Sequence, residues 1–138
     1  MKSQDLVAQA ILARARAYAP YSGFKVGAAL LGKSGAVYLG CNIENAAYSS
    51  TNCAERTAIF KAISEGERDF IAMAIVADTD QGCSPCGVCR QVLVEFFDDT
   101  VEIHLANLNG VIQSRTISQL LPGAFRPGDV QRNDRREL

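Results

Sequence analysis

The segment CSPCGVCRQVL at residues 83–93 places a cysteine at every third position and then continues with an amphipathic pattern typical of a helix. A further cysteine, Cys53, stands two residues before Glu55 in the sequence CAE. Thiolates bind zinc and iron–sulfur clusters, and a cysteine pair with this spacing is also typical of redox proteins. What these thiols hold therefore decides what the protein does.

The composition of the 138-residue chain fits one domain with a single hydrophobic core. The first twenty residues lack the apolar core of a signal peptide, and no apolar run reaches membrane-spanning length. Five cysteines, an odd number, are more typical of a reducing compartment than of a disulfide framework. The net charge of -1 argues against a nucleic acid partner. We expect a soluble, cytoplasmic protein that acts on a small molecule and has no membrane partner.

Hydrophobic periodicity predicts helices and strands in alternation. Predicted helices cover residues 4–18, 51–66, a segment after Ser84 and 117–121, and predicted strands cover 25–31, 36–41, 71–77, 101–106 and 111–116. This order is typical of a three-layer α/β/α fold, in which a five-stranded mixed sheet has helices on both faces. We expect a single domain over residues 1–130 and a charged, flexible tail over 131–138.

Two of the predicted helices carry the cysteines, and residue preferences predict their caps. Thr51 or Asn52 would cap the first helix, and Ser84 would cap the second, with Pro85 at its first position. The inward faces are predicted to be Ala54, Ala58, Ile59, Ala62 and Ile63 in the first helix, and Val88, Val92, Leu93 and Phe96 in the second.

Crossover helices begin at the carboxyl ends of parallel strands, so their starts meet at one edge of the sheet. Cys53 lies at one such start, and Cys86 and Cys89 lie at the other. Helix N-termini favour thiolates, and three thiolates suffice to bind one zinc ion. Because no fourth ligand is evident, the sequence predicts an open tetrahedral site with water in the fourth position, as in catalytic zinc sites.

Three other interpretations use the same thiols. An iron–sulfur cluster would continue the series from Cys83 with a cysteine near position 93, where the sequence has Leu93, although Cys41 or Cys53 could substitute. A redox dithiol of Cys86 and Cys89 leaves Cys53 without a role. A structural zinc site would need Cys83 or Cys41 as its fourth ligand.

Glu55 separates these interpretations, because a structural site has no use for a carboxylate beside the metal. Three thiolates make zinc a weaker Lewis acid than three neutral histidines do, so a hydrolytic site needs a base for its water. Arg56 would lie next to the thiolates and moderate their negative charge by hydrogen bonding. Taken alone, both residues also fit a solvated helix surface.

The motifs CAE at 53–55 and PCGVCRQ at 85–91 resemble those of the zinc-dependent nucleoside deaminases. The resemblance extends to FKVGAAL at 24–30, GCNIENAAYSSTNCAERTAI at 40–59 and LLPGAF at 120–125, which are similar to the short, homotetrameric cytidine deaminases. It covers the chain from about Tyr18 to Phe125. The function implied is zinc-dependent deamination of cytidine and 2′-deoxycytidine to uridine and 2′-deoxyuridine in pyrimidine salvage.

The resemblance also implies roles at the reacting end of the site. Cys53, Cys86 and Cys89 would hold one zinc ion per subunit. Glu55 would move protons from the zinc water to N3 of the cytosine and then assist the departure of ammonia. Arg56 would support the thiolates.

For the rest of the substrate, the resemblance implies that Asn42 and Glu44 bind the ribose hydroxyls and that Phe24 lies against the pyrimidine face. Asn45 and Tyr48 would belong to the same substrate loop, with Tyr48 facing a neighbouring subunit. Phe125 would cover the site of an adjacent chain, so that sites are shared in a homotetramer. Taken alone, the phenylalanines also fit core positions, and the asparagines fit turns.

Two alternatives remain within the enzyme class. One is a deaminase of another cytosine nucleoside, such as an antibiotic of the blasticidin type, although NIEN at 42–45 favours a hydroxylated sugar. The other is a polynucleotide deaminase, which the lack of basic charge disfavours. His104 is expected to be structural and Cys41 to be a small buried residue, and Cys83 is left as a spare ligand, an inert thiol or an oxidation-prone one.

Overall fold

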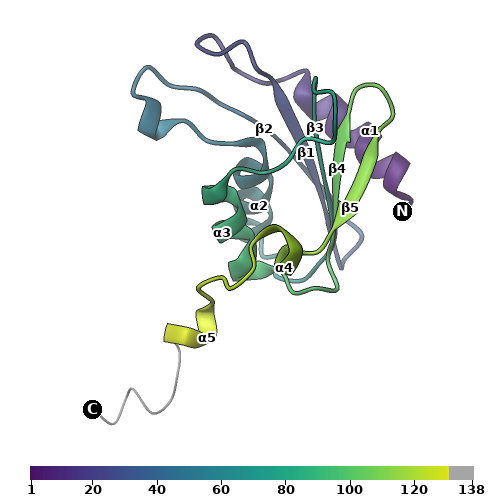
Figure 1. Ribbon diagram of the computed structural model, residues 1–138, viewed down its shortest axis with the longest axis vertical. Helices are drawn as coiled ribbons and strands as arrows, with labels where there is room; N and C mark the ends of the chain where they lie inside the picture. The colour runs from purple at the N-terminus through teal and green to yellow at the C-terminus, as the bar shows by residue number, and fades with distance from the viewer. Residues whose placement is uncertain (131–138) are drawn as a thin grey trace.

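A computed structural model describes residues 1–130, which form five strands and five α-helices with one short 3-10 helix (Figure 1). The expected tail at 131–138 lies outside the described residues. The elements are α1 (Ser3–Arg14), β1 (Val26–Gly32), β2 (Val37–Cys41), the 3-10 helix η1 (Tyr48–Ser50), α2 (Ala54–Ser64), β3 (Phe70–Ala77), α3 (Gly87–Phe96), β4 (Glu102–Asn107), β5 (Ile112–Arg115), α4 (Ile117–Leu120) and α5 (Pro127–Val130).

The five strands form one mixed sheet in the order β2-β1-β3-β4-β5. β1 is antiparallel to both β2 and β3, β3 is parallel to β4, and β5 is antiparallel to β4. β2, β3 and β4 therefore run in the same direction. Because α2 connects β2 to β3 and α3 connects β3 to β4, both helices begin at the same edge of the sheet, as the sequence predicted.

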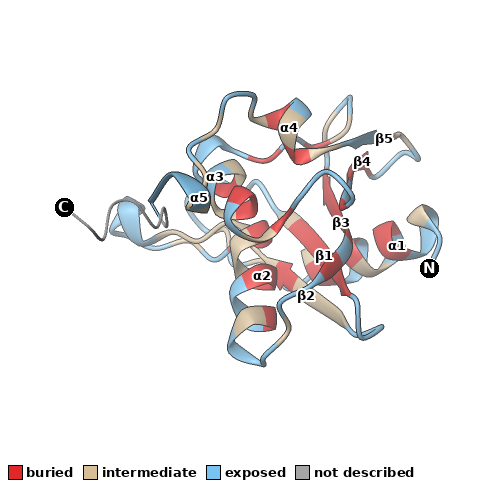
Figure 2. Cartoon of the chain, turned by 90° about the horizontal axis from the view of Figure 1, so that it is seen from below, coloured by how far each residue is buried: buried red, intermediate tan, exposed pale blue. Residues whose placement is uncertain are grey.

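The sheet is covered on both faces, which confirms the predicted three-layer arrangement. α1 lies on one side of the sheet, and α2 and α3 lie on the other (Figure 1). In Figure 2 the buried residues gather in the central strands and on the inward faces of these helices. Leu6, Val7 and Ala10 of α1 pack on the first face, whereas Ile59 of α2 and Leu93 of α3 belong to the larger core on the second. No helix within residues 1–130 is long and apolar enough to cross a membrane.

Small residues bring the first turn of α2 close to the sheet. A Cβ atom added to Gly40 of β2 would lie 2.4 Å from the Ala54 carbonyl oxygen and 2.5 Å from the Ala58 nitrogen. Ala54, Ala58 and Ala62 form the buried face of α2, as expected. β2 and α2 therefore approach at backbone distance, which fixes where α2 begins relative to the sheet edge.

The first helix is shorter than the predicted range 4–18, because it ends at Arg14. Tyr18 has extended backbone and pairs with the segment after β2, donating its N–H to the Asn42 carbonyl at 3.0 Å and accepting from the Glu44 N–H at 2.8 Å. Pairing with a distant segment therefore replaces the last helical turn.

Both predicted caps of the cysteine-bearing helices are wrong. α2 is capped by Cys53, because Asn52 pairs through its backbone with Ile43. α3 begins at Gly87, and its cap is Cys86, whose sulfur accepts a hydrogen bond from the Cys89 N–H at 3.5 Å. In both helices the cysteine itself occupies the capping position.

The predicted inward face of α3 is correct only in part. Leu93 is fully buried and Val92 and Phe96 pack partly against the core. Val88, in contrast, is 58% exposed. Because α3 begins later than predicted, Val88 lies in its first turn and does not belong to the core.

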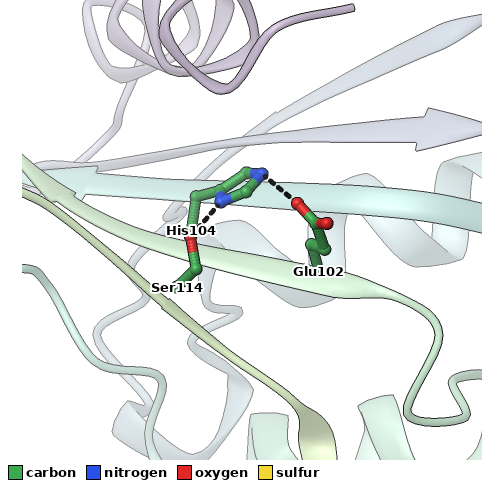
Figure 3. Close-up of polar contacts among 3 residues, drawn as sticks. All are labelled: Glu102, His104 and Ser114. Atoms are coloured by element: carbon green, nitrogen blue, oxygen red, sulfur yellow. Dashed lines mark hydrogen bonds and ion pairs between the residues drawn. The ribbon is translucent and has the colours of Figure 1, made fainter.

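His104 is a structural residue of the sheet, as the sequence suggested. It lies on β4 and is buried, with Nδ1 2.8 Å from the Ser114 Oγ atom of β5 and Nε2 3.6 Å from a carboxylate oxygen of Glu102 (Figure 3). Burial lowers the pKa of His104, while the Glu102 carboxylate acts in the opposite direction.

This burial makes the stability of the fold depend on pH. His104 is the only histidine, and its pKa is lower in the folded state than the 6.5 of an exposed histidine. As the pH falls through 6.5, the unfolded chain therefore takes up a proton that the folded chain resists, and the free energy of unfolding falls. Urea unfolding of the wild type and of His104→Asn, compared at about pH 7.5 and about pH 5, tests this. We expect the free energy of unfolding to fall less in the variant. An equal fall in both proteins would contradict the lowered pKa of His104.

Candidate metal centre and active site

The three predicted thiols lie together at the sheet edge where α2 and α3 begin. Cys53 caps α2, Cys86 caps α3 and Cys89 lies in the first turn of α3. Their sulfur atoms all lie within 4.8 Å of one another, and those of Cys53 and Cys86 are 3.8 Å apart. Thiolates about 2.3 Å from a tetrahedral zinc ion would lie about 3.8 Å apart. The donor set therefore fits zinc without rearrangement of the backbone.

Within residues 1–130 no fourth histidine, cysteine or carboxylate donor joins this group. Cys83 is buried nearby, and burial raises its pKa to about 12, so it remains a neutral thiol. Cys41 lies at the end of β2 and is half-buried rather than fully buried as expected. The closed structural zinc site and the iron–sulfur cluster both require a fourth protein ligand that this group lacks.

The electrostatics of the thiols favour binding of a cation. A hydrogen bond from the Cys89 thiol lowers the pKa of Cys53 to about 5, and the same hydrogen bond raises the pKa of Cys89. The Arg56 guanidinium donates from Nη2 to the Cys53 sulfur at 3.3 Å, as predicted. Its Nε atom is buried without a hydrogen-bond partner among the described residues. One cationic side chain thus lies beside a cluster that becomes strongly negative when its thiols ionise.

Glu55 lies in the first turn of α2, one residue after the helix begins, and is 4% exposed. Burial raises the pKa of its carboxyl group to about 7. A carboxyl group with a pKa near neutrality can both accept and release a proton at physiological pH. Buried position and shifted pKa together make Glu55 the strongest candidate for acid–base chemistry beside the thiols.

A cavity of about 250 Å³ opens beside the metal ligands. It is lined by Ser22, Phe24, Val26, Asn42, Glu44, Thr51, Cys53, Ala54, Glu55, Cys83, Ser84 and Cys86. The cavity therefore joins two of the thiols and the candidate proton carrier to three predicted substrate contacts: Phe24, Asn42 and Glu44. Phe24 is 46% exposed, so it is not a core residue.

The polar side chains of Asn42 and Glu44 in this cavity are held by the chain from Tyr21 to Val26, which leads into β1. Asn42 accepts from the Val26 N–H at 2.9 Å and donates to the Phe24 carbonyl at 2.8 Å. Glu44 accepts from the N–H groups of Tyr21 and Ser22 at 2.9 and 3.0 Å. Both side chains are thus fixed before any ligand binds.

Three of the predicted substrate-binding residues do not line this cavity. Asn45 and Tyr48 line a neighbouring hollow, where the Tyr48 ring meets Tyr21 edge to face with 6.1 Å between centroids. Phe125 is 62% exposed and lies beside Gln91 of α3, which donates to its carbonyl at 2.8 Å. A single chain therefore does not place these residues against a ligand beside the metal.

Sequence reasoning missed a residue that holds the cysteine loop in place. The Arg90 guanidinium donates to the Pro85 carbonyl and the Ser84 hydroxyl, each at 2.8 Å, and to the Leu120 carbonyl. It thereby joins the loop before α3 to the end of α4. The sequence around Arg90 does not indicate this role. Two of the three acceptors are backbone carbonyl groups, and the Leu120 carbonyl lies thirty positions away.

An open set of three thiols beside a buried carboxyl group, at one edge of a mixed sheet with helices on both faces, defines the class of zinc-dependent deaminases. A family model described as the cytidine and deoxycytidylate deaminase zinc-binding region matches residues 1–105. The chain belongs to this cytidine and deoxycytidylate deaminase family, and zinc is its cofactor.

Individual relatives agree with this assignment. The chain is 55% identical to a cytidine deaminase of Sporosarcina psychrophila over 130 residues, which cover 94% of this chain and 96% of that protein. It is 57% identical to one of Halalkalibacterium halodurans, with 94% and 98% covered. The crystal structure of a cytidine deaminase from Burkholderia pseudomallei matches with a TM-score of 0.88 and 48% identity, over 91% of this chain and 100% of that one. The predicted family and fold are thus confirmed.

The grouping of the thiols predicts how zinc is retained. Cys89→Ala removes one of three ligands and should weaken zinc binding at least about 100-fold, more than loss of an outer contact does. Cys83→Ala changes a buried thiol of the same loop outside the group and should keep one zinc ion per chain. Metal analysis after dialysis against a chelator measures both. Equal loss of zinc from the two variants would show that Cys83 is a ligand.

Proposed function

We propose that the chain catalyses the hydrolysis of cytidine and 2′-deoxycytidine to uridine and 2′-deoxyuridine, with release of ammonia. The observation that carries this proposal is the shared cavity, which is lined by Glu55 and two of the thiols together with Asn42 and Glu44. The relatives named above are cytidine deaminases, which supports the same substrate class.

Zinc, held by Cys53, Cys86 and Cys89, would supply the Lewis acidity that makes water acidic enough to lose a proton near neutral pH. Glu55 takes that proton and delivers it to N3 of the cytosine as the oxygen adds to C4. Glu55, a carboxylate again, then takes the proton of the hydroxyl group now bound to C4 and passes it to the amino group, which leaves as ammonia as the C4 carbonyl forms. Three thiolates make zinc a weaker Lewis acid. Arg56 offsets part of this effect, because its hydrogen bond to Cys53 draws negative charge away from the sulfur.

The other residues that line the cavity bind the nucleoside. Phe24 packs against the pyrimidine face, which its half-exposed position at the cavity wall permits. Asn42 and Glu44 bind the sugar hydroxyls, and Asn45 shapes the loop that follows them. A neutral amide and a carboxylate suit hydroxyl groups, whereas a phosphate would require cationic side chains that this cavity lining lacks.

We place the enzyme in the cytoplasm and in nucleoside salvage. All five cysteines are free, and an open three-thiol site requires a reducing compartment. Recovery of the activity in the soluble cytosolic fraction of its source cells would support this location, and recovery outside the cell would contradict it.

Replacement of Glu55 tests the chemistry directly. Glu55→Gln keeps the shape of the side chain but cannot carry a proton, so kcat for cytidine should fall by about 10⁴-fold while zinc stays bound. Glu65→Gln, at the end of the same helix, is the matched control and should keep wild-type turnover. Ultraviolet absorbance follows cytidine, and metal analysis follows zinc. Turnover retained by the Glu55 variant would refute its role.

The same assay distinguishes the substrate. At equal concentrations, wild-type enzyme should deaminate cytidine and 2′-deoxycytidine much faster than a cytosine nucleoside antibiotic of the blasticidin type. The opposite order would replace the proposed substrate while leaving the reaction type intact.

We further propose that the active form is a homotetramer with shared sites. Tyr48 and Phe125 are 76% and 62% exposed, and neither lines the cavity of its own chain. Aromatic side chains left outside in this way suit a site completed by a second copy.

Co-expression of two inactive variants tests the sharing. Glu55→Gln chains lack the proton carrier, and Phe125→Ala chains lack the covering aromatic ring. In a mixed tetramer some sites combine an intact Glu55 with an intact Phe125 from the neighbour, so activity should exceed that of either variant alone severalfold. Sedimentation velocity reports the assembly, and a fully active monomer would contradict the proposal.

A further inference from the structure

The carboxylate of Glu44 is held by a short turn that sequence analysis did not single out. Its Oε1 atom accepts from the Tyr21 and Ser22 N–H groups at 2.9 and 3.0 Å, and its Oε2 atom accepts from the Ser22 hydroxyl. These three hydrogen bonds keep the Glu44 carboxylate ionised, and they lower its pKa. The Glu44 side chain is therefore held by Tyr21 and Ser22, about twenty residues earlier in the chain.

The direction of the Ser22 hydroxyl is fixed by its partners. Its oxygen accepts from the Phe24 N–H at 3.0 Å, and the carboxylate of Glu44 can only accept. The hydroxyl proton must therefore point at Glu44. One side chain thus joins the backbone of Phe24, at the cavity wall, to the carboxylate at the cavity end.

The backbone of Glu44 is anchored by the same stretch of chain. The Glu44 N–H donates to the Tyr18 carbonyl at 2.8 Å, four residues before Ser22. A free glutamate side chain has three rotatable bonds, and ordering it opposes binding. With the backbone held by Tyr18 and the carboxylate held by Ser22, this ordering is already complete before a ligand arrives.

The number of hydrogen bonds that the Glu44 carboxylate can accept shows how many acceptor positions remain for a ligand. A carboxylate offers about four acceptor positions, of which the turn occupies two on Oε1 and one on Oε2. One position is left, on the oxygen that Ser22 orients. Because Ser22 and Glu44 both line the cavity, this position is available to a hydroxyl group bound there.

We propose that Ser22 is a positioning residue for nucleoside binding, whose hydroxyl orients Glu44 so that a single acceptor position on Oε2 faces the sugar. The inference rests on the proposed role of Glu44 and extends it. Ser22 is neither a metal ligand nor the proton carrier of the proposed reaction, and its hydroxyl is bonded to Glu44, so its effect falls on binding. The sugar contact is present in both the ground state and the transition state, and its loss therefore raises KM with little change in kcat.

The test compares Ser22→Ala, Ser22→Thr and Ser34→Ala. Ser34 is a matched control, because its hydroxyl donates to Glu67 and its oxygen accepts from the Ala36 N–H at 3.3 Å, outside the cavity. Ser22→Ala should raise KM for cytidine about tenfold, in line with loss of a hydrogen bond to a charged group, with kcat within about twofold. Ser22→Thr keeps a hydroxyl and should restore most of the binding, and Ser34→Ala should behave as wild type.

A nucleoside without the 2′- and 3′-hydroxyls separates positioning from a general structural effect. With 2′,3′-dideoxycytidine the ratio of KM between Ser22→Ala and wild type should fall to about one, because Glu44 then has no 2′- or 3′-hydroxyl to bind. Likewise, adding Ser22→Ala to Glu44→Ala should raise KM no further. Melting temperature and zinc content of each variant exclude loss of the fold as the cause.

The outcomes distinguish the sugar-binding role of Glu44 from the positioning role of Ser22. An unchanged KM for cytidine in Glu44→Ala would overturn the sugar-binding role of Glu44. A raised KM in Glu44→Ala together with a wild-type KM in Ser22→Ala would leave that role intact and overturn the positioning by Ser22. An equal penalty with cytidine and with the dideoxynucleoside would also overturn it, because the defect would then not involve the sugar.

Discussion

The site depends on three sulfur atoms that come from the starts of two separate helices and still lie within 4.8 Å of one another. This convergence is a property of the sheet, because β2, β3 and β4 run in one direction and their crossover helices begin at one edge. Gly40 lets α2 approach β2 at backbone distance, and Arg90 holds the loop before α3. Neither Gly40 nor Arg90 lines the cavity, yet both determine where the sulfur atoms lie.

A zinc site with three protein ligands rather than four explains why a buried carboxyl group lies beside the thiols. A closed site would need no proton carrier, whereas here Glu55 is buried beside the thiols and has a pKa raised to about 7. Arg56 donates to Cys53 and lowers the cost of gathering negative sulfur atoms. The polar side chains of Asn42 and Glu44, which line the same cavity, are held by backbone groups of Val26, the first residue of β1, and of Tyr21 before it. These side chains are thus fixed before any ligand binds.

The sequence predicted those features that depend on local pattern. Apolar runs bounded by turn residues identified the strands. The positions of Cys53, Cys86 and Cys89 predicted the thiol group, because helix starts must meet at one sheet edge. It failed where a distant segment changes the local outcome. Pairing of Tyr18 with the segment after β2 shortens α1. Cys53 caps the helix for which Thr51 or Asn52 was expected, and Cys86 caps the one for which Ser84 was expected. Ser22 was missed because its partner Glu44 lies twenty-two positions away, beyond any local signal.

X-ray absorption at the zinc edge of the purified enzyme measures the ligand set directly. An open site predicts three sulfur neighbours at about 2.3 Å and one oxygen neighbour at about 2.0 Å for each zinc ion, one ion per chain. Four sulfur neighbours, or an active preparation without zinc, would contradict the account.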